Sequence, residues 1–269
     1  MSEADSYYQN IADYYDVDAT DFEQRYTENP ILQKIRGEFR AVTNRYEFDN
    51  ALEIGCGPGF DVEFFAETHP ERQIDAIDVS PGMVELARKR INLKQLKNTS
   101  VKVGSVEDLP ELFPGKKWDM IYVFFGGLNT VYDLRKAAQQ LHDVSHADTT
   151  LVLTFVNRFY LLDALLWALR LRFDRAPERL LNRWNGYSEK RPLKSRVISS
   201  GDVHRAFEPD FKRIFSRGYS ILYPAWYRAN HLPKLGRFAE TLWKVDGVIN
   251  KTPFWNTGEY SLYVYKAQK

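Results

Sequence analysis

From residue 50 to residue 156, the chain alternates between short apolar runs and longer amphipathic segments, and this alternation limits the fold more than any other feature. The apolar runs have the length of strands, and the segments between them have the length of helices. Trp118–Phe125 is almost wholly apolar, as expected of a strand buried on both faces of a sheet. Strands that alternate with helices form parallel sheets through right-handed crossovers. The pattern therefore predicts an α/β fold with a doubly wound, mostly parallel, seven-stranded sheet.

The same pattern locates the elements. The expected strands are Ala51–Ile54, Gln73–Val79, Val101–Ser105, Trp118–Phe125, Thr149–Val156, Phe211–Leu222 and Glu259–Lys266. The expected helices are Asp61–His69, Pro81–Leu96, Tyr132–Val144, Asp202–Phe207 and His231–Ile249. Residues 1–48 read as a helical N-terminal cover and residues 49–269 as one domain, with helical insertions at about 157–196, after the fifth strand, and 223–257, before the last strand.

Composition excludes several classes of protein. The formal net charge is +1, so the chain has no strong overall field for nucleic acid or an anionic membrane. No signal peptide is readable at the start, and no apolar run reaches the ~18 residues of a spanning helix. A lone cysteine, Cys56, fits a reducing compartment. We therefore expect a cytoplasmic protein without a transmembrane segment.

A glycine-rich turn, Gly55–Gly59, follows the first expected strand. Glycines at alternate positions let the backbone turn tightly and approach a ligand closely. A dinucleotide fingerprint would need glycine at position 60, which is Phe60, and the Gly-Lys-Ser/Thr of a phosphate loop is missing. Glu53, two positions before Gly55, suits a cationic amino-acid ligand better than a pyrophosphate. The turn and Glu53 thus favour a ligand with a cationic amino-acid part over a dinucleotide or a nucleotide phosphate.

Asp78 ends the second expected strand, 19 residues beyond Gly59. A carboxylate at this place can accept hydrogen bonds from both hydroxyls of a ribose. The alternative is a helix N-cap for the segment that begins at Pro81, a role that Ser80 serves equally well. The glycine turn and Glu53 at this spacing favour the ribose role.

Four segments in order resemble the class I S-adenosylmethionine (SAM) dependent methyltransferases, in particular the small-molecule, type 11-like domain. They are LEIGCGPG, IDVSPGMVELAR, GSVEDLP and WDMIYVFFGGLNTV, and the resemblance covers about residues 48–157. It implies a Rossmann-like fold, SAM as the cofactor and methyl transfer as the activity.

Carried over residue by residue, the resemblance implies a set of cofactor contacts. Gly55, Cys56 and Gly57 would line the methionine part through their backbone, and Glu53 and Gly59 are further expected cofactor-binding residues. Asp78 would hold the ribose, with Val79, Ser105 and Val106 around the adenine, Asp108 as a loop cap and Phe124 over the sulfonium. On the N-terminal segment, which often covers the cofactor in small-molecule relatives, Tyr15 and Arg25 are the expected contacts among Tyr7, Tyr8, Tyr14 and Tyr15, with a packed helix face as the alternative.

The candidates for chemistry are fewer. Asn129 follows the fourth strand at the carboxyl edge of the sheet, where such sheets bind ligands, although it could equally cap a helix. His231 lies in the late insertion, where it faces either the acceptor or the surface. His142 and His146 have i,i+4 spacing, but a solvated face is favoured over a metal site, and no metal is expected.

The basic insertion at 157–196 has three readings: a lid over an acceptor pocket, an amphipathic surface for lipid, or a cover of the sheet edge. With the aromatic residues at 223–257 it suggests a partly apolar small-molecule acceptor. The Asn/Asp-Pro-Pro-Tyr/Phe pattern of enzymes that methylate nucleobase amino groups is missing, so nucleic acid is not expected. The alternatives are a SAM-binding protein without methyl transfer and a methyltransferase acting on RNA or protein.

Overall fold

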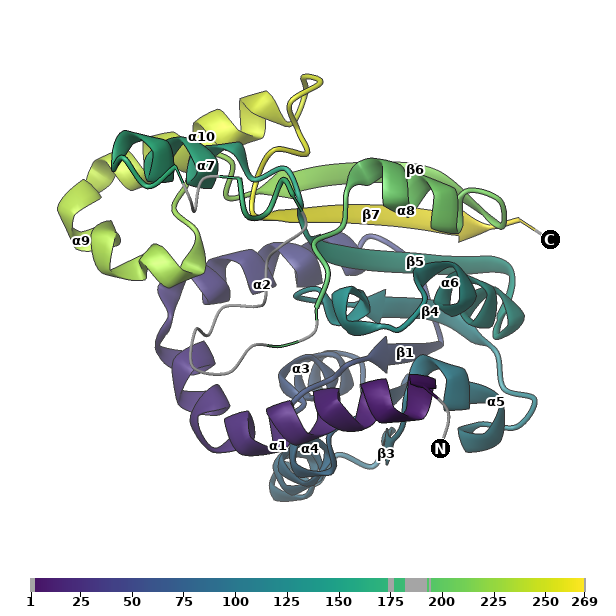
Figure 1. Cartoon of the computed structure of the whole chain (residues 1–269). Helices are drawn as coiled ribbons and strands as arrows, with labels where there is room; N and C mark the ends of the chain where they lie inside the picture. The colour runs from purple at the N-terminus through teal and green to yellow at the C-terminus, as the bar shows by residue number, and fades with distance from the viewer. Residues whose placement is uncertain (1–2, 174–176, 182–192, 194, 269) are drawn as a thin grey trace.

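A computed structural model describes residues 3–173, 177–181, 193 and 195–268, and shows one seven-stranded sheet in the order β3-β2-β1-β4-β5-β7-β6 (Figure 1). Strands β1 to β5 pair in parallel, whereas β7 is antiparallel to both of its neighbours. The strands are β1 (Asn50–Ile54), β2 (Gln73–Asp78), β3 (Thr99–Val103), β4 (Trp118–Val123), β5 (Ser145–Val156), β6 (Phe211–Tyr219) and β7 (Tyr260–Ala267). The predicted Rossmann-like, mostly parallel sheet is confirmed.

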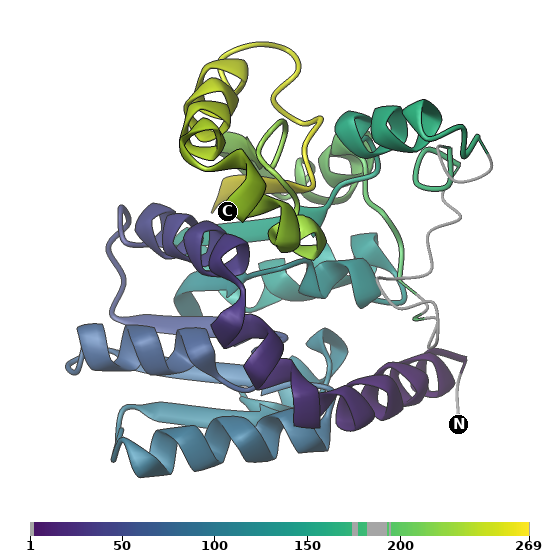
Figure 2. The same ribbon diagram turned by 90° about the vertical axis from the view of Figure 1, so that its left-hand side faces the viewer.

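Helices cover both faces of this sheet (Figures 1 and 2). The α-helices are α1 (Glu3–Glu28), α2 (Pro30–Thr43), α3 (Phe60–Thr68), α4 (Pro81–Leu93), α5 (Leu109–Leu112), α6 (Leu134–Asp143), α7 (Leu161–Leu169), α8 (Ser200–Phe207), α9 (Leu232–Leu235) and α10 (Arg237–Ile249). Short 3-10 helices are η1 (Val106–Asp108), η2 (Gly127–Thr130) and η3 (Trp226–His231).

The core has two layers, because successive side chains of a strand point to opposite faces. In β4, Met120 and Tyr122 pack with α2, α3 and α4, whereas Ile121 and Val123 pack with α6 and α8. All four side chains are fully buried. This accounts for the nearly continuous apolar sequence of the strand.

One predicted helix is interrupted in the structure. The segment His231–Ile249 is not a single helix, because the chain ends α9 and turns at Gly236, with φ of 50° and ψ of −129°, before α10 begins. Pro233 stands in the first turn of α9, where its missing N–H costs nothing.

The first insertion is described only in part. It begins with α7, but positions 174–176, 182–192 and 194 of the predicted 157–196 insertion lie outside the described residues. The described helices include none that is long and apolar enough to cross a bilayer.

Candidate functional site

A pocket lies at the carboxyl ends of β1 and β4, where the strand order of the sheet reverses. Open α/β sheets bind ligands at this switch point. The glycine turn after β1, the ends of β2 and β4, and the start of η1 line it. Helix α1 adds a wall, and both views show α1 running along the lower half of the molecule (Figures 1 and 2). The edge of the sheet predicted from the sequence therefore holds a pocket.

The glycine turn presents its backbone to this pocket through Gly55, Cys56 and Gly57. Gly57 has φ of 53°, in the left-handed region that favours glycine. Gly59 does not line the pocket: an added Cβ there would stand 2.9 Å from Cβ of Ala87, so this glycine lets α4 pack against the turn. Burial raises the pKa of the Cys56 thiol well above its ordinary value, so the thiol stays neutral.

Asp78 is buried at the end of β2 and lines the pocket. Its carboxylate accepts hydrogen bonds from the N–H of Gly57 at 2.8 Å and the N–H of Ser80 at 2.9 Å. The N-cap of α4 is Ser80, whose Oγ accepts from the N–H of Met83 at 3.0 Å. The alternative reading of Asp78 as this helix cap is therefore wrong. Burial raises the pKa of Asp78 to about 6.

Glu53 and Arg36 place buried charges of opposite sign in the wall of the same pocket. Glu53 accepts a hydrogen bond from the Tyr122 hydroxyl at 3.2 Å, and burial, with Asp61 nearby, raises its pKa well above the ordinary value. Arg36 on α2 is only 5% exposed, and its Nε has no hydrogen-bond partner among the described residues. Leaving such a donor unpaired is costly, which points to a ligand acceptor.

Three aromatic rings surround the Arg36 guanidinium: Tyr26 at 4.9 Å, Phe60 at 4.7 Å and Phe125 at 5.1 Å. They hold it by cation–π attraction. Its nearest acid, Asp61, is 3.8 Å away and is bound more closely by Arg40, at 2.6 Å. Sequence reasoning missed Arg36. The available signal was its position on the apolar face of α2, four residues after Leu32 and three before Phe39.

Helix α1 brings Tyr8, Tyr15, Phe22 and Tyr26 to the pocket. Tyr15 was an expected contact, whereas Tyr7 and Tyr14 are not among the lining residues. The Tyr8 hydroxyl donates to Glu107 at 2.7 Å and accepts from the N–H of Tyr132 at 3.2 Å.

On the η1 side, the predicted Val79, Ser105 and Val106 all line the pocket. Ser105 caps η1 through a reciprocal pair of contacts with Asp108, which confirms Asp108 as a loop cap. Phe124 follows β4, is buried and lines the pocket beside Tyr122.

Four predicted residues do not line this pocket: Gly59, described above, and Arg25, Asn129 and His231. Arg25 forms a two-point ion pair with Asp18 along α1. His231 ends η3, in the insertion before β7.

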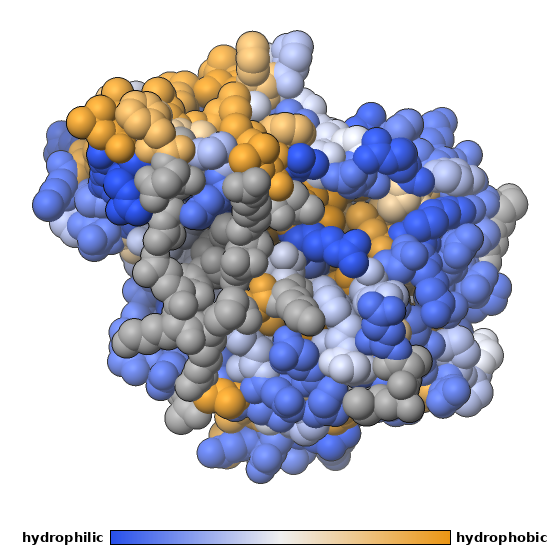
Figure 3. Space-filling view, in the orientation of Figure 1, coloured by the Kyte–Doolittle hydropathy of each residue, from blue (hydrophilic) through white to orange (hydrophobic). Residues whose placement is uncertain are grey.

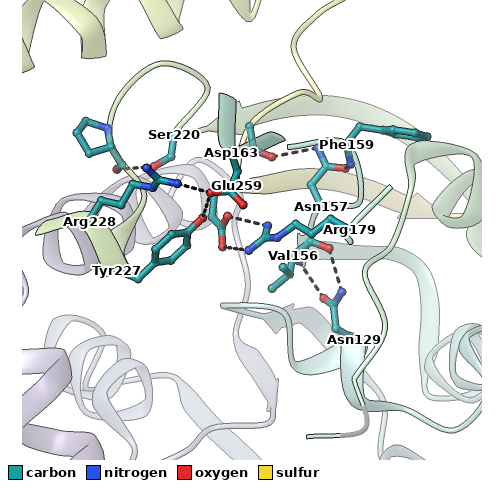
Figure 4. Close-up of polar contacts among 12 residues, drawn as sticks. Asn129, Val156, Asn157, Phe159, Asp163, Arg179, Ser220, Tyr227, Arg228 and Glu259 are labelled. Carbon is teal, nitrogen blue, oxygen red and sulfur yellow. Dashed lines mark hydrogen bonds and ion pairs between the residues drawn. The ribbon is translucent and has the colours of Figure 1, made fainter. Parts of the chain in front are cut away.

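Asn129 is buried in η2, and its side chain joins two other segments (Figure 4). Its Nδ2 donates to the carbonyls of Val156 and Arg196, and its Oδ1 accepts from the N–H of Val156 at 2.9 Å. Both polar atoms are thus used by backbone partners. The expectations of a catalytic Asn129 and of a helix cap are both corrected: it is a tie between η2 and the end of β5.

The histidine pair His142 and His146 is divided between two elements. His142 lies on α6, and His146 lies on β5, where its Nε2 is 2.8 Å from Asp119. Among the described residues, no group of three or more His, Cys, Asp or Glu side chains is arranged to hold a metal ion.

Comparison with known proteins identifies this part of the chain. Residues 51–148 match the family model described as a methyltransferase domain. The malonyl-[acyl-carrier protein] O-methyltransferase of Priestia megaterium is 32% identical over 111 residues, which is 39% of this chain and 36% of that protein. The tRNA (guanine-N(7)-)-methyltransferase of Clostridium acetobutylicum is 31% identical over 92 residues, 34% of this chain and 41% of that protein. The chain thus spans less than half the length of the curated relatives it matches.

Solved structures support the fold over nearly the whole chain. A SAM-dependent methyltransferase from Thermotoga maritima superposes with a TM-score of 0.60 at 14% identity, covering 96% of this chain and all of that one. The prediction of a methyltransferase domain is confirmed for residues 51–148.

Proposed function

We propose that this chain, which carries a methyltransferase domain at residues 51–148, transfers a methyl group from SAM to a partly apolar small-molecule acceptor. The observation that carries the proposal is the juxtaposition of Glu53, Arg36 and Asp78 in one pocket. An α-amino acid and a ribose are the two polar parts of SAM, and these three side chains offer a partner to each of their charged or hydroxyl groups.

The residues fit the amino-acid part of SAM through charge. Arg36 has an Nε–H that makes no hydrogen bond within the described residues and could donate to an α-carboxylate, and Glu53 is a carboxylate for the α-ammonium. A cation near Glu53 would offset the burial that now raises its pKa. The backbone of Gly55 and Gly57 leaves room for the carbon chain of the methionine part of SAM.

The nucleoside and the sulfonium meet other walls of the pocket. Asp78 would accept from the ribose hydroxyls, with Val79 and Val106 against the adenine and Ser105 at its edge. The rings of Tyr15 and Phe124 would contact the sulfonium by cation–π attraction.

SAM supplies the reactive methyl group when bound, and the protein must orient the acceptor and exclude water. Ile11, Phe22, Phe125 and Val131 contribute apolar wall to the same pocket, which favours an acceptor with an apolar part.

Calorimetry with two nucleosides tests the cofactor assignment. S-adenosylhomocysteine contains the amino-acid part, whereas 5′-methylthioadenosine keeps adenine and ribose but lacks it. Wild-type protein should bind S-adenosylhomocysteine more tightly than 5′-methylthioadenosine. Arg36→Met should remove most of this difference, while Asp78→Ala should weaken both ligands. A thermal-shift screen in which NAD stabilises the protein, and neither nucleoside nor SAM does, would overturn the proposal.

The acceptor class is tested with SAM labelled in its methyl group and a cell extract. Label should appear in the fraction extracted into organic solvent. The similarity to a tRNA methyltransferase makes RNA an alternative acceptor. Label recovered in RNA or in protein would show a macromolecular acceptor instead. Tight binding of SAM without label in any fraction would indicate a SAM-binding protein without methyl transfer.

A further inference from the structure

Helix α7 is apolar except for Asp163, and yet none of its nine residues is buried. Leu161, Leu165 and Leu169 follow one another at i,i+4 spacing and are 46%, 55% and 70% exposed. A helix that is hydrophobic all round is normally buried in a protein core or a membrane. Within the part of the chain that the structure describes, the leucine face of α7 is therefore not covered by other apolar side chains.

The orientation of α7 is fixed by its single charged residue. Asp163 accepts a hydrogen bond from the Tyr227 hydroxyl at 3.1 Å and pairs with Arg228 (Figure 4). Beside this contact, buried Arg179 and Glu259 form a two-point ion pair at 2.7 and 3.2 Å. At 100° per residue, Asp163 lies about 160° around the helix from the middle of the leucine stripe. The anchor and the stripe thus occupy opposite faces.

Other exposed apolar side chains gather at the same end of the molecule. Figures 1 and 2 both place α7 at the top of the molecule, and Figure 2 shows it apart from α10, which lies at the other side of the top. The space-filling view shows a broad apolar area at this end (Figure 3). Leu171 and Phe173, which directly follow α7, are 77% and 66% exposed. We call the three leucines of α7 together with Leu171 and Phe173 the apolar surface.

Basic residues accompany this surface. Arg170 and Arg172 lie 5.7 and 6.0 Å from the Trp167 ring on α7. Exposed Leu and Phe with Trp and a basic fringe are typical of helices that lie in a membrane interface. Basic side chains beside a bilayer are attracted to anionic headgroups.

We propose that the apolar surface docks on a bilayer of anionic phospholipids, with the α7 leucines and Phe173 entering the boundary between headgroups and acyl chains. Docking goes beyond the proposed activity and does not depend on it. Its position has a consequence for the pocket: α7 closely follows Val156, which packs against Gly126 of the pocket wall. A bilayer at this surface would lie beside the carboxyl edge of the sheet.

Vesicle flotation tests the proposal with the full chain. Vesicles of phosphatidylcholine are compared with vesicles containing 30% phosphatidylglycerol. Wild-type protein should float with the anionic vesicles and dissociate as salt is raised. Leu165→Glu and Leu169→Glu should each lower binding by about tenfold. Arg170→Glu with Arg172→Glu should remove the preference for anionic lipid.

Leu93→Glu is the matched control, because Leu93 is 75% exposed at the end of α4, outside the apolar surface. It should float like wild type. Each variant is first checked for an unchanged thermal shift with S-adenosylhomocysteine, so that loss of binding is not loss of fold. Wild-type protein that floats with neither vesicle, or a dimer in solution that Leu165→Glu converts to monomer, would overturn the proposal; the second result would assign the surface to a contact between copies.

Discussion

The carboxylate of Asp16 on α1 accepts a hydrogen bond from the N–H of Gly82, in the first turn of α4, at 2.9 Å. The same carboxylate accepts from the Ser80 hydroxyl, two residues beyond Asp78. A negative charge is favourable at a helix N-terminus. Helix α1 is thus tied to the turn that carries the candidate ribose ligand, and Arg90 of α4 adds an ion pair to Glu23 farther along α1.

This tie predicts how α1 responds to the cofactor. Amide exchange over residues 3–28 should be slowed when S-adenosylhomocysteine is bound, because the ligand fills the space beneath Tyr8 and Tyr15. Asp16→Ala should speed exchange of α1 in the free protein. Hydrogen-exchange mass spectrometry measures both. Full protection of α1 without ligand would mean that it is a static cover.

Asp78→Ala should weaken binding of S-adenosylhomocysteine by about 1–3 kcal/mol through lost charge-assisted hydrogen bonds, with the fold intact. Calorimetry gives the affinity. Asp133→Ala is a useful control, because Asp133 caps α6 and does not line the pocket. That change should cost about 1 kcal/mol of stability and no affinity. Equal affinities for Asp78→Ala and wild type would remove the ribose assignment.

Arg36→Met should lower affinity for S-adenosylhomocysteine by roughly ten- to a hundredfold, since an ionic hydrogen bond is worth about 1.5–3 kcal/mol. Affinity for 5′-methylthioadenosine should be unchanged. An equal loss for both ligands would indicate that Arg36 only supports the packing of Tyr26 and Phe60.

Cofactor binding should depend on pH through Asp78. In the free protein its pKa is about 6, above the ordinary 3.8. A ribose bound to the ionised carboxylate lowers this pKa, so affinity should be full above pH 7 and fall as pH drops through 6. Titrations at pH 5, 6 and 7.5 should show this, and Asp78→Asn should flatten the profile. An unchanged wild-type profile would contradict the prediction.

In the absence of ligand, the contribution of Asp78 to the free energy of unfolding changes with pH in the opposite direction. Because the folded-state pKa of Asp78 is raised, its contribution is most favourable below pH 4 and is lost as pH rises from about 4 to about 6. Asp78→Asn should remove this loss. Urea unfolding without ligand at pH 4.5 and 7.5 should therefore show a smaller loss of stability in the variant between these two pH values.

Asn129→Ala should lower the free energy of unfolding by about 1–3 kcal/mol, because it removes the acceptor of the buried Val156 N–H and a donor to the Val156 carbonyl. Affinity for S-adenosylhomocysteine should stay within twofold of wild type. Urea unfolding and calorimetry check these expectations. A large loss of affinity with unchanged stability would return Asn129 to the site.

The features that could be predicted from the sequence are those whose structural cause lies within a few residues. The Ser80-Pro81 start of α4, the turn at Gly55–Gly59 and the apolar run of β4 all carry their structural cause within a few residues. The role of Asn129 depends on partners 27 and 67 positions away, which no local pattern indicates. Arg36 is similar, because its surrounding rings come from α1, α3 and the segment after β4.

The place of β7 between β5 and β6 determines the order in which the sheet can come apart. Strand β6 pairs only with β7 among the described strands, so it can separate while β7 still rests on β5. The reverse is not available, since losing β7 removes the neighbour of β6 as well. The strands that carry the pocket, β1, β2 and β4, lie on the other side of β5. Partial opening from the β6 edge could therefore rearrange the outer half of the sheet and leave the candidate cofactor pocket assembled.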